Sequence, residues 1–146
     1  DLRLHGLDAS PAFLREARRR LEDEATDATL TLGDAASLPY RDRVFDGVAF
    51  GGTPNEVRDR PAAFAEIARV ARPGAPVFLM AAVRAATPFG RLGQLALGVG
   101  GIATPPADRL LAEAEAAGLR VERVERRPPV AIALARREGG SQASSP

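Results

Sequence analysis

The stretch LHGLDASPAFLREA at residues 4–17 decides the fold, because a strand, an acidic turn and the start of a helix follow one another in it. The alternating leucines at its start predict a short strand over residues 2–8. Ser10 before Pro11 supplies an N-cap residue and a proline at the first helical position. An amphipathic helix is therefore predicted over residues 11–24. Its apolar face carries Phe13, Leu14, Ala17 and Leu21.

The rest of the chain continues this alternation of strands and helices. Further strands are predicted at 28–35, 44–52, 75–83, 119–127 and 130–136. One helix opens at Pro61 and stops at Pro73, and another runs from Thr104 to Gly118. Such an order is typical of an α/β fold with a mostly parallel sheet. Residues 75–83 are apolar without alternation, which predicts a strand covered on both faces.

Composition narrows the class of protein. The chain has 146 residues, 45% of them hydrophobic, which suits one domain over residues 1–137 and a polar, disordered tail over 138–146. Because cysteine is absent, disulfides and thiolate chemistry are excluded, no metal site is predicted, and we expect a cytoplasmic protein. The 20 basic and 19 acidic residues are interspersed, which predicts a small-molecule partner and no nucleic acid. No apolar run is long enough to span a membrane.

Two segments allow more than one interpretation. Residues 84–103, with Phe89, Leu92, Leu95 and Leu97 among few charges, are either a lid over an apolar ligand or a helix packed on the sheet. The glycine cluster at 97–101 follows an apolar stretch and is interpreted as a hinge or a helix end.

Acidic residues follow two of the predicted strands. Asp8 ends the first strand and Asp34 follows the second. In a parallel sheet, ligands lie beyond the carboxyl ends of the strands, where a carboxylate can accept hydrogen bonds from both hydroxyls of a ribose. Asp34 could accept from the amine of an adenine while the Ala35 N–H meets a ring nitrogen. Each aspartate could equally hold only its own turn.

Four motifs together resemble the class I S-adenosylmethionine-dependent methyltransferases, in the small-molecule branch of the ubiquinone and menaquinone enzymes. They are GLDASPAFLREAR (6–18), GDAASLPYRDRVFDGV (33–48), EIARVARPGAPVFL (66–79) and TPPADRLLAEAEAAGLRVERVERR (104–127). The resemblance covers most of residues 4–127. It implies a Rossmann-like sheet, mostly parallel with an antiparallel C-terminal strand, and methyl transfer to a small-molecule acceptor.

The resemblance also implies which residues hold the cofactor, S-adenosyl-L-methionine. They are Asp8, Ala9, Asp34, Ala35, Leu38, Phe50 and Gly51. Asp8 would hold the ribose, Asp34 and Ala35 the adenine edge, and Leu38 would pack on the adenine face. Phe50 and Gly51 would line the path toward the methionine portion.

The residues that contact the acceptor are less defined. Thr53, Asn55 and Glu56 lie where the family places substrate contacts, although Pro54-Asn55 is also an ordinary turn. No catalytic residue is assigned. Glu56 and His5 are the candidates if a general base is needed, although a structural histidine within the first strand is the commoner case.

One family element is absent from this sequence. Members carry a strand and a glycine-rich D-x-G-x-G-x-G turn upstream of the position of Asp8, and the glycines let the backbone approach the cofactor. We therefore expect an N-terminally truncated sheet, with the missing strand between those that end at Asp8 and Phe50. Unpaired edges there predict an unstable or rearranged fragment. The alternative to a methyltransferase is a catalytically inactive, methyltransferase-like interaction or dimerisation module. A third interpretation is a nucleotide-binding oxidoreductase half-domain, and the GDA-x-x-LP turn argues against it.

Overall fold

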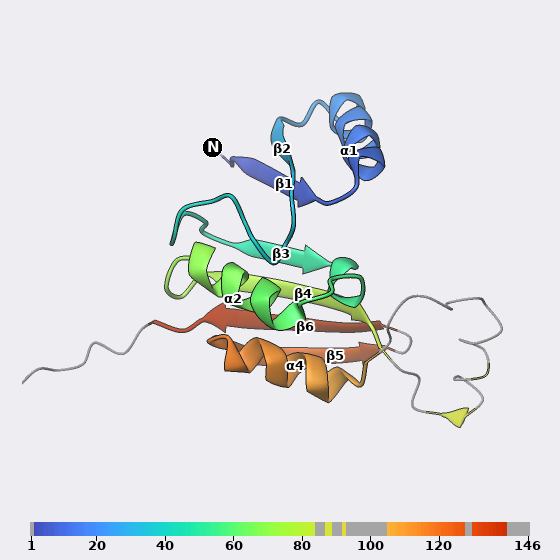
Figure 1. Cartoon of the computed structure of the whole chain (residues 1–146), viewed down its shortest axis with the longest axis vertical. Coiled ribbons are helices and arrows are strands. Elements are labelled where there is room, and N and C mark those ends of the chain that lie inside the picture. Colours follow the sequence, from blue (N-terminus) through green and yellow to red (C-terminus); the bar gives the residue numbers. More distant parts are fainter. Residues whose placement is uncertain (1, 84–86, 89–91, 93–104, 128–129, 140–146) are drawn as a thin grey trace, which may run out of the picture.

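The computed structural model describes residues 2–83, 87–88, 92, 105–127 and 130–139. Its elements follow the predicted alternation, although the second and third strands are shorter than expected (Figure 1). They are β1 (Leu4–Asp8), α1 (Pro11–Asp23), β2 (Ala28–Leu32), β3 (Val48–Gly51), the 3-10 turn η1 (Thr53–Asn55), α2 (Arg60–Val70), β4 (Pro76–Ala82), α4 (Ala107–Ala116), β5 (Leu119–Arg127) and β6 (Val130–Arg137).

The strands form two sheets. β1 and β2 pair in parallel, from Leu4 opposite Ala28 to Asp8 opposite Leu32. The larger sheet has the order β3-β4-β6-β5, in which β3 and β4 are parallel. β6 runs antiparallel to both of its neighbours. The predicted mixture of parallel strands with an antiparallel C-terminal strand is therefore confirmed.

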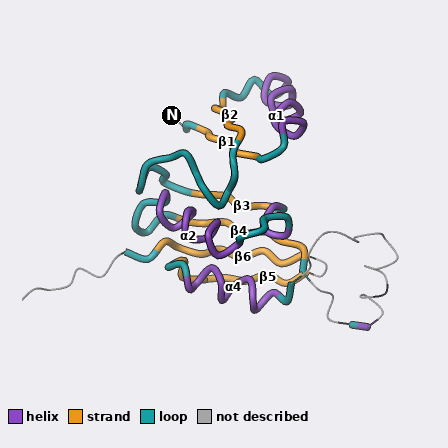
Figure 2. The backbone as a smooth tube through the Cα atoms, in the orientation of Figure 1, coloured by secondary structure: helices purple, strands orange, loops and turns teal. Residues whose placement is uncertain are grey.

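The strands β1 and β3 lie at edges of separate sheets. Within the described residues no ladder of hydrogen bonds joins them, as the sequence predicted for the strands that end at Asp8 and Phe50. Figure 1 and Figure 2 show the β1–β2 pair beside the β3 edge of the larger sheet. Side chains and backbone from both sheets can therefore line one shared space.

Helix starts are set by capping side chains. Ser10 Oγ accepts a hydrogen bond from the Phe13 N–H at 3.4 Å, so the predicted N-cap of α1 is confirmed. Asp59 Oδ1 caps α2 by accepting from the Ala62 N–H at 3.0 Å. Each bond satisfies a donor that the first helical turn leaves free.

The core lies between the larger sheet and the helices α2 and α4. Phe64, Val70, Val77 and Leu119 are fully buried there. Helix α1 has no fully buried residue, and its Phe13 remains 64% exposed. Burial therefore stabilises the larger sheet far more than the β1–α1–β2 unit.

The prediction that residues 75–83 are covered on both faces is wrong. In β4, Val77 and Leu79 are buried, whereas Phe78 between them is 39% exposed. Its partner in β6, Leu134, is 36% exposed. The reason is that α2 and α4 pack against each other on the same face of the sheet.

Several predictions concern residues outside those described. Most of the segment 84–103, the glycine cluster at 97–101 and residues 140–146 of the expected tail are among them. Leu92 is described and is 61% exposed. Among the described residues, no helix has the length and apolar character that crossing a membrane requires.

Candidate functional site

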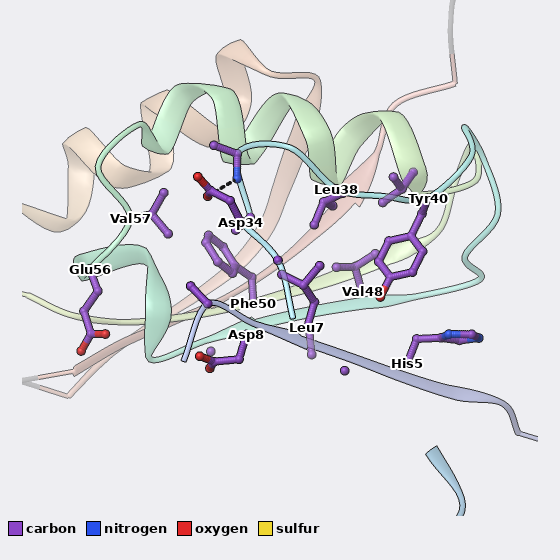
Figure 3. Close-up of a pocket in the computed structure, with 18 of the residues that line it drawn as sticks. His5, Leu7, Asp8, Asp34, Leu38, Tyr40, Val48, Phe50, Glu56 and Val57 are labelled. Carbon is purple, nitrogen blue, oxygen red and sulfur yellow. Dashed lines mark hydrogen bonds between the residues drawn. The ribbon is translucent and has the colours of Figure 1, made fainter. Parts of the chain in front are cut away.

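A cleft of about 1140 Å³ runs along the space between β1 and β3, from His5 and Val48 near their starts to their carboxyl ends (Figure 3). Ligand pockets in proteins commonly enclose roughly 300–1,000 Å³. One end of the cleft lies at the carboxyl ends of parallel strands, where open α/β sheets bind ligands. All seven residues predicted to hold the cofactor line this cleft: Asp8, Ala9, Asp34, Ala35, Leu38, Phe50 and Gly51. Their contact with a cofactor stays a prediction.

Asp8 is half-buried at the end of β1. Its Oδ1 accepts a hydrogen bond from the Ser10 N–H at 2.7 Å, so the local turn role is confirmed for one oxygen. No hydrogen bond to its second oxygen occurs within the described residues. The carboxylate can therefore hold the turn and still accept from a ligand in the cleft.

Asp34 repeats this arrangement at the end of the neighbouring strand. Its Oδ1 accepts from the Ala36 N–H at 2.9 Å, the dashed contact in Figure 3. The Ser37 N–H also bonds to the Asp34 carbonyl oxygen at 3.0 Å. Because the register of β1 and β2 sets Asp8 opposite Leu32, two residues before Asp34, both carboxylates reach the same cleft.

The apolar wall of the cleft is continuous with the core. Phe50 is only 7% exposed, and its ring meets that of Phe64 edge-on with centroids 5.9 Å apart. A Cβ built on Gly51 would approach Met80 Cε at 3.6 Å, an ordinary contact. Backbone geometry instead requires glycine at Gly52, where φ is +72°.

An aromatic cluster of His5, Tyr40 and Phe45 forms one end of the cleft. His5 is exposed. The centroid of its ring lies 6.0 Å from that of Tyr40 and 5.6 Å from that of Phe45, and the rings meet edge to face in both pairs. The Tyr40 hydroxyl is buried and has no hydrogen-bond partner among the described residues. A ligand or water that reached it would satisfy a polar group that is otherwise unpaired.

The turn η1 carries Asn55 and leads to Glu56. Asn55 is 5% exposed; its Nδ2 donates to the Ala82 carbonyl at 2.7 Å and its Oδ1 accepts from the Ala82 N–H at 2.8 Å. Asn55 therefore anchors the turn to β4, and it is not among the residues that line the cleft. Glu56 is exposed and lines the cleft, far from His5 in Figure 3.

The comparisons with known proteins identify the family. A family model described as a methyltransferase domain matches residues 2–79. This chain belongs to that family. It is 35% identical over 95 residues to a demethylmenaquinone methyltransferase of Symbiobacterium thermophilum, and 36% identical over 89 residues to one of Roseiflexus sp.. These matches cover 64% and 61% of this chain but only 38% and 37% of the relatives.

Solved structures share the fold of the methyltransferase domain. The [4+2]-cyclase SpnF superposes with a TM-score of 0.79 at 20% identity, over 95% of this chain and 67% of that one. A SAM-dependent methyltransferase from Methanosarcina mazei gives 0.76 at 16% identity, over 93% and 82%. The expected Rossmann-like architecture is confirmed, and the cyclase shows that this architecture alone does not fix the reaction.

The sequence analysis did not identify two residues of α2 whose side chains bond to the backbone of the cleft-lining residues Leu38 and Tyr40. Glu66 and Arg69 of α2, which we call the loop clamp, hold the loop that carries Leu38. The hydrogen bond from Arg69 holds the pKa of Glu66 below its ordinary value, so the pair stays ionised at neutral pH. The Glu-x-x-Arg spacing in the third motif was the available signal, because it sets both side chains on one helix face.

Proposed function

We propose that this protein binds S-adenosylmethionine in the cleft and transfers its methyl group to a small-molecule acceptor. The observation that carries the proposal is the meeting of Asp8 and Asp34 at one cleft, in a chain that belongs to the methyltransferase domain family. Carboxylates at neighbouring strand ends suit a ligand with a diol and an adenine amine.

Each lining residue then has a chemical role. The second oxygen of Asp8 accepts from the ribose hydroxyls, and Asp34 with the Ala35 N–H meets the edge of the adenine. Leu38 packs on the adenine face, while Phe50 and Gly51 line the path to the methionine portion. Bound S-adenosylmethionine would supply a methyl group on a sulfonium, so the protein's own task is alignment and the exclusion of water.

The acceptor is proposed at the level of chemical class. The relatives named demethylmenaquinone methyltransferase support a small organic acceptor. Where that acceptor must lose a proton, Glu56 and His5 are the candidate bases, because both line the cleft.

Calorimetric titration of the protein with S-adenosylmethionine tests the proposal. The decisive variant is Asp8→Asn, because an asparagine oxygen can still accept from the Ser10 N–H and preserve the turn, while the charge is lost. We expect binding by the wild type and about tenfold weaker binding by the variant. Asp27→Asn, at an exposed position outside the cleft, is the matched control.

Two outcomes would count against the proposal. Folded wild-type protein that gives no heat would refute cofactor binding and favour a non-catalytic module. Equal affinity of Asp8→Asn and wild type would show that Asp8 does not hold the ribose.

A further inference from the structure

Residues 33–47 between β2 and β3 form a loop without helix or strand, and its first part is one wall of the cleft. Leu38 and Tyr40 both line the cleft from this loop. The last part of the loop is fixed by backbone bonds: the Arg43 N–H donates to the Arg69 carbonyl at 2.9 Å and the Val44 N–H to the Val70 carbonyl at 2.8 Å. The part that carries Leu38 and Tyr40 is held differently.

The loop clamp supplies the side-chain contacts that hold Leu38 and Tyr40. Glu66 Oε2 accepts from the Leu38 N–H at 2.7 Å. Arg69 Nη2 donates to the Leu38 carbonyl at 3.1 Å, and Nη1 donates to the Tyr40 carbonyl at 2.8 Å. Both peptide groups of Leu38 are therefore fixed by charged groups on one helix.

The clamp is itself braced within α2. Arg69 Nε bonds to Glu66 Oε1 at 2.6 Å and Nη2 to Glu66 Oε2 at 2.7 Å, so the two side chains orient each other. Arg69 Nη1 also bonds to Asp42 Oδ1 at 2.7 Å, farther along the loop. The Glu66 and Arg69 side chains are 20% and 31% exposed, which shields the pair from much of the solvent screening that weakens surface ion pairs.

We propose that Glu66 and Arg69 are positioning residues for the nucleoside part of the cofactor, because they hold Leu38 and Tyr40 in place before the ligand arrives. This inference rests on the proposed function. A wall that is already ordered spares the ligand the entropy of ordering it. Without the clamp, binding must first order the loop, and even one residue ordered on binding weakens affinity by about tenfold.

The test compares Glu66→Ala with Glu66→Gln. Alanine removes the acceptor for the Leu38 N–H, whereas glutamine keeps an oxygen at that place. The matched control is Glu16→Ala, because Glu16 makes the same i,i+3 ion pair with Arg19 on α1 but lies outside the cleft. Hydrogen exchange at the Leu38 amide reports on the loop, and exchange at Leu79 in β4 reports on the whole fold.

We expect Glu66→Ala to speed exchange at Leu38 at least tenfold, with Leu79 unchanged, and to raise the Kd for S-adenosylhomocysteine about tenfold. Glu16→Ala should exchange and bind within about threefold of the wild type. Glu66→Gln keeps the acceptor for the Leu38 N–H but turns an amide NH2 toward Arg69 Nε, so it should fall between the wild type and Glu66→Ala in both measurements. Partial rescue by glutamine separates positioning from a charge effect on the ligand.

Three results would overturn the inference. Unchanged exchange at Leu38 in Glu66→Ala would show that the clamp does not hold the loop. Faster exchange with unchanged affinity would leave the clamp a structural role only. A wild-type protein that binds no S-adenosylhomocysteine would refute the proposed function and this inference together. Binding by the wild type, with equal affinity in Glu66→Ala, would refute this inference alone.

Discussion

Replacement of Asn55 by alanine should destabilise the protein more than its position in a short turn suggests. The side chain is 5% exposed and makes two hydrogen bonds, of 2.7 and 2.8 Å, to the backbone of Ala82. Asn55→Ala removes the hydrogen-bond partner of both the Ala82 N–H and the Ala82 carbonyl. Each buried polar group left without a partner costs about 1–3 kcal/mol of stability. Because Ala82 is only half-buried and water can reach it in part, we expect a total loss of about 3 kcal/mol.

Urea denaturation with linear extrapolation measures this loss. A loss of about 3 kcal/mol corresponds to a fall in Tm of about 10 °C for a domain of this size. Thr29→Ala, at an exposed position in β2, is the control and should change the stability by less than about 0.5 kcal/mol. A loss below about 1 kcal/mol in Asn55→Ala would refute the reasoning, because it would mean that the two bonds contribute little.

Asn55→Asp adds a pH dependence to the same test. The new carboxylate keeps an acceptor for the Ala82 N–H but turns a second acceptor toward the Ala82 carbonyl. Burial beside that carbonyl should raise the pKa of the new carboxyl above its unfolded value of about 3.9. The variant should therefore be most stable relative to wild type at low pH, where the protonated carboxyl donates, and lose that stability as the pH rises through its folded-state pKa.

Two further predictions concern Glu113 and Tyr40. Glu113→Gln should cost about 1–2 kcal/mol at pH 7, because Glu113 pairs at 2.9 Å with Arg60 and both side chains are 15% exposed. The hydrogen bond from Arg60 lowers the pKa of Glu113 from its ordinary value, so this stability is present at neutral pH and is lost as the pH falls through the folded-state pKa. Urea denaturation in a series of buffers from neutral to strongly acidic pH measures it, and a difference from wild type that stayed constant over the whole series would contradict the prediction. Tyr40→Phe should leave Tm unchanged or raise it slightly in the absence of ligand, because the buried hydroxyl has no partner among the described residues; a fall of more than about 4 °C would show that it has one.

Local signals predicted the elements that position the site. The Ser10-Pro11 pair predicted the start of α1, and the acids after the first two strands predicted which ends meet at the cleft. These features depend on residues close in sequence, such as an N-cap and its third successor, so a single sequence reveals them. The predicted lengths of β2 and β3 were too great. Residues typical of strands and of the turns after them extend beyond the hydrogen-bonded ladder, so the sequence does not show where the pairing ends.

Contacts between distant segments could not be predicted from the same patterns. Asn55 bonds to Ala82, 27 residues away, and Glu66 bonds to Leu38, 28 residues away. Neither partner is a side chain with its own signature, since both are peptide groups that every residue carries. The exposure of Phe78 was missed for a related reason: an apolar residue in a strand does not reveal which face the helices cover.

His5 is the single histidine of the chain, and its ring makes edge-to-face contacts with both Tyr40 and Phe45. In a proton NMR spectrum its imidazole signals would stand alone and carry ring-current displacements from both neighbours. Because His5 belongs to the smaller sheet and the two rings belong to the loop that leads into the larger one, those displacements report the separation of the two sheets. A change in that separation on ligand binding would be visible without any introduced label.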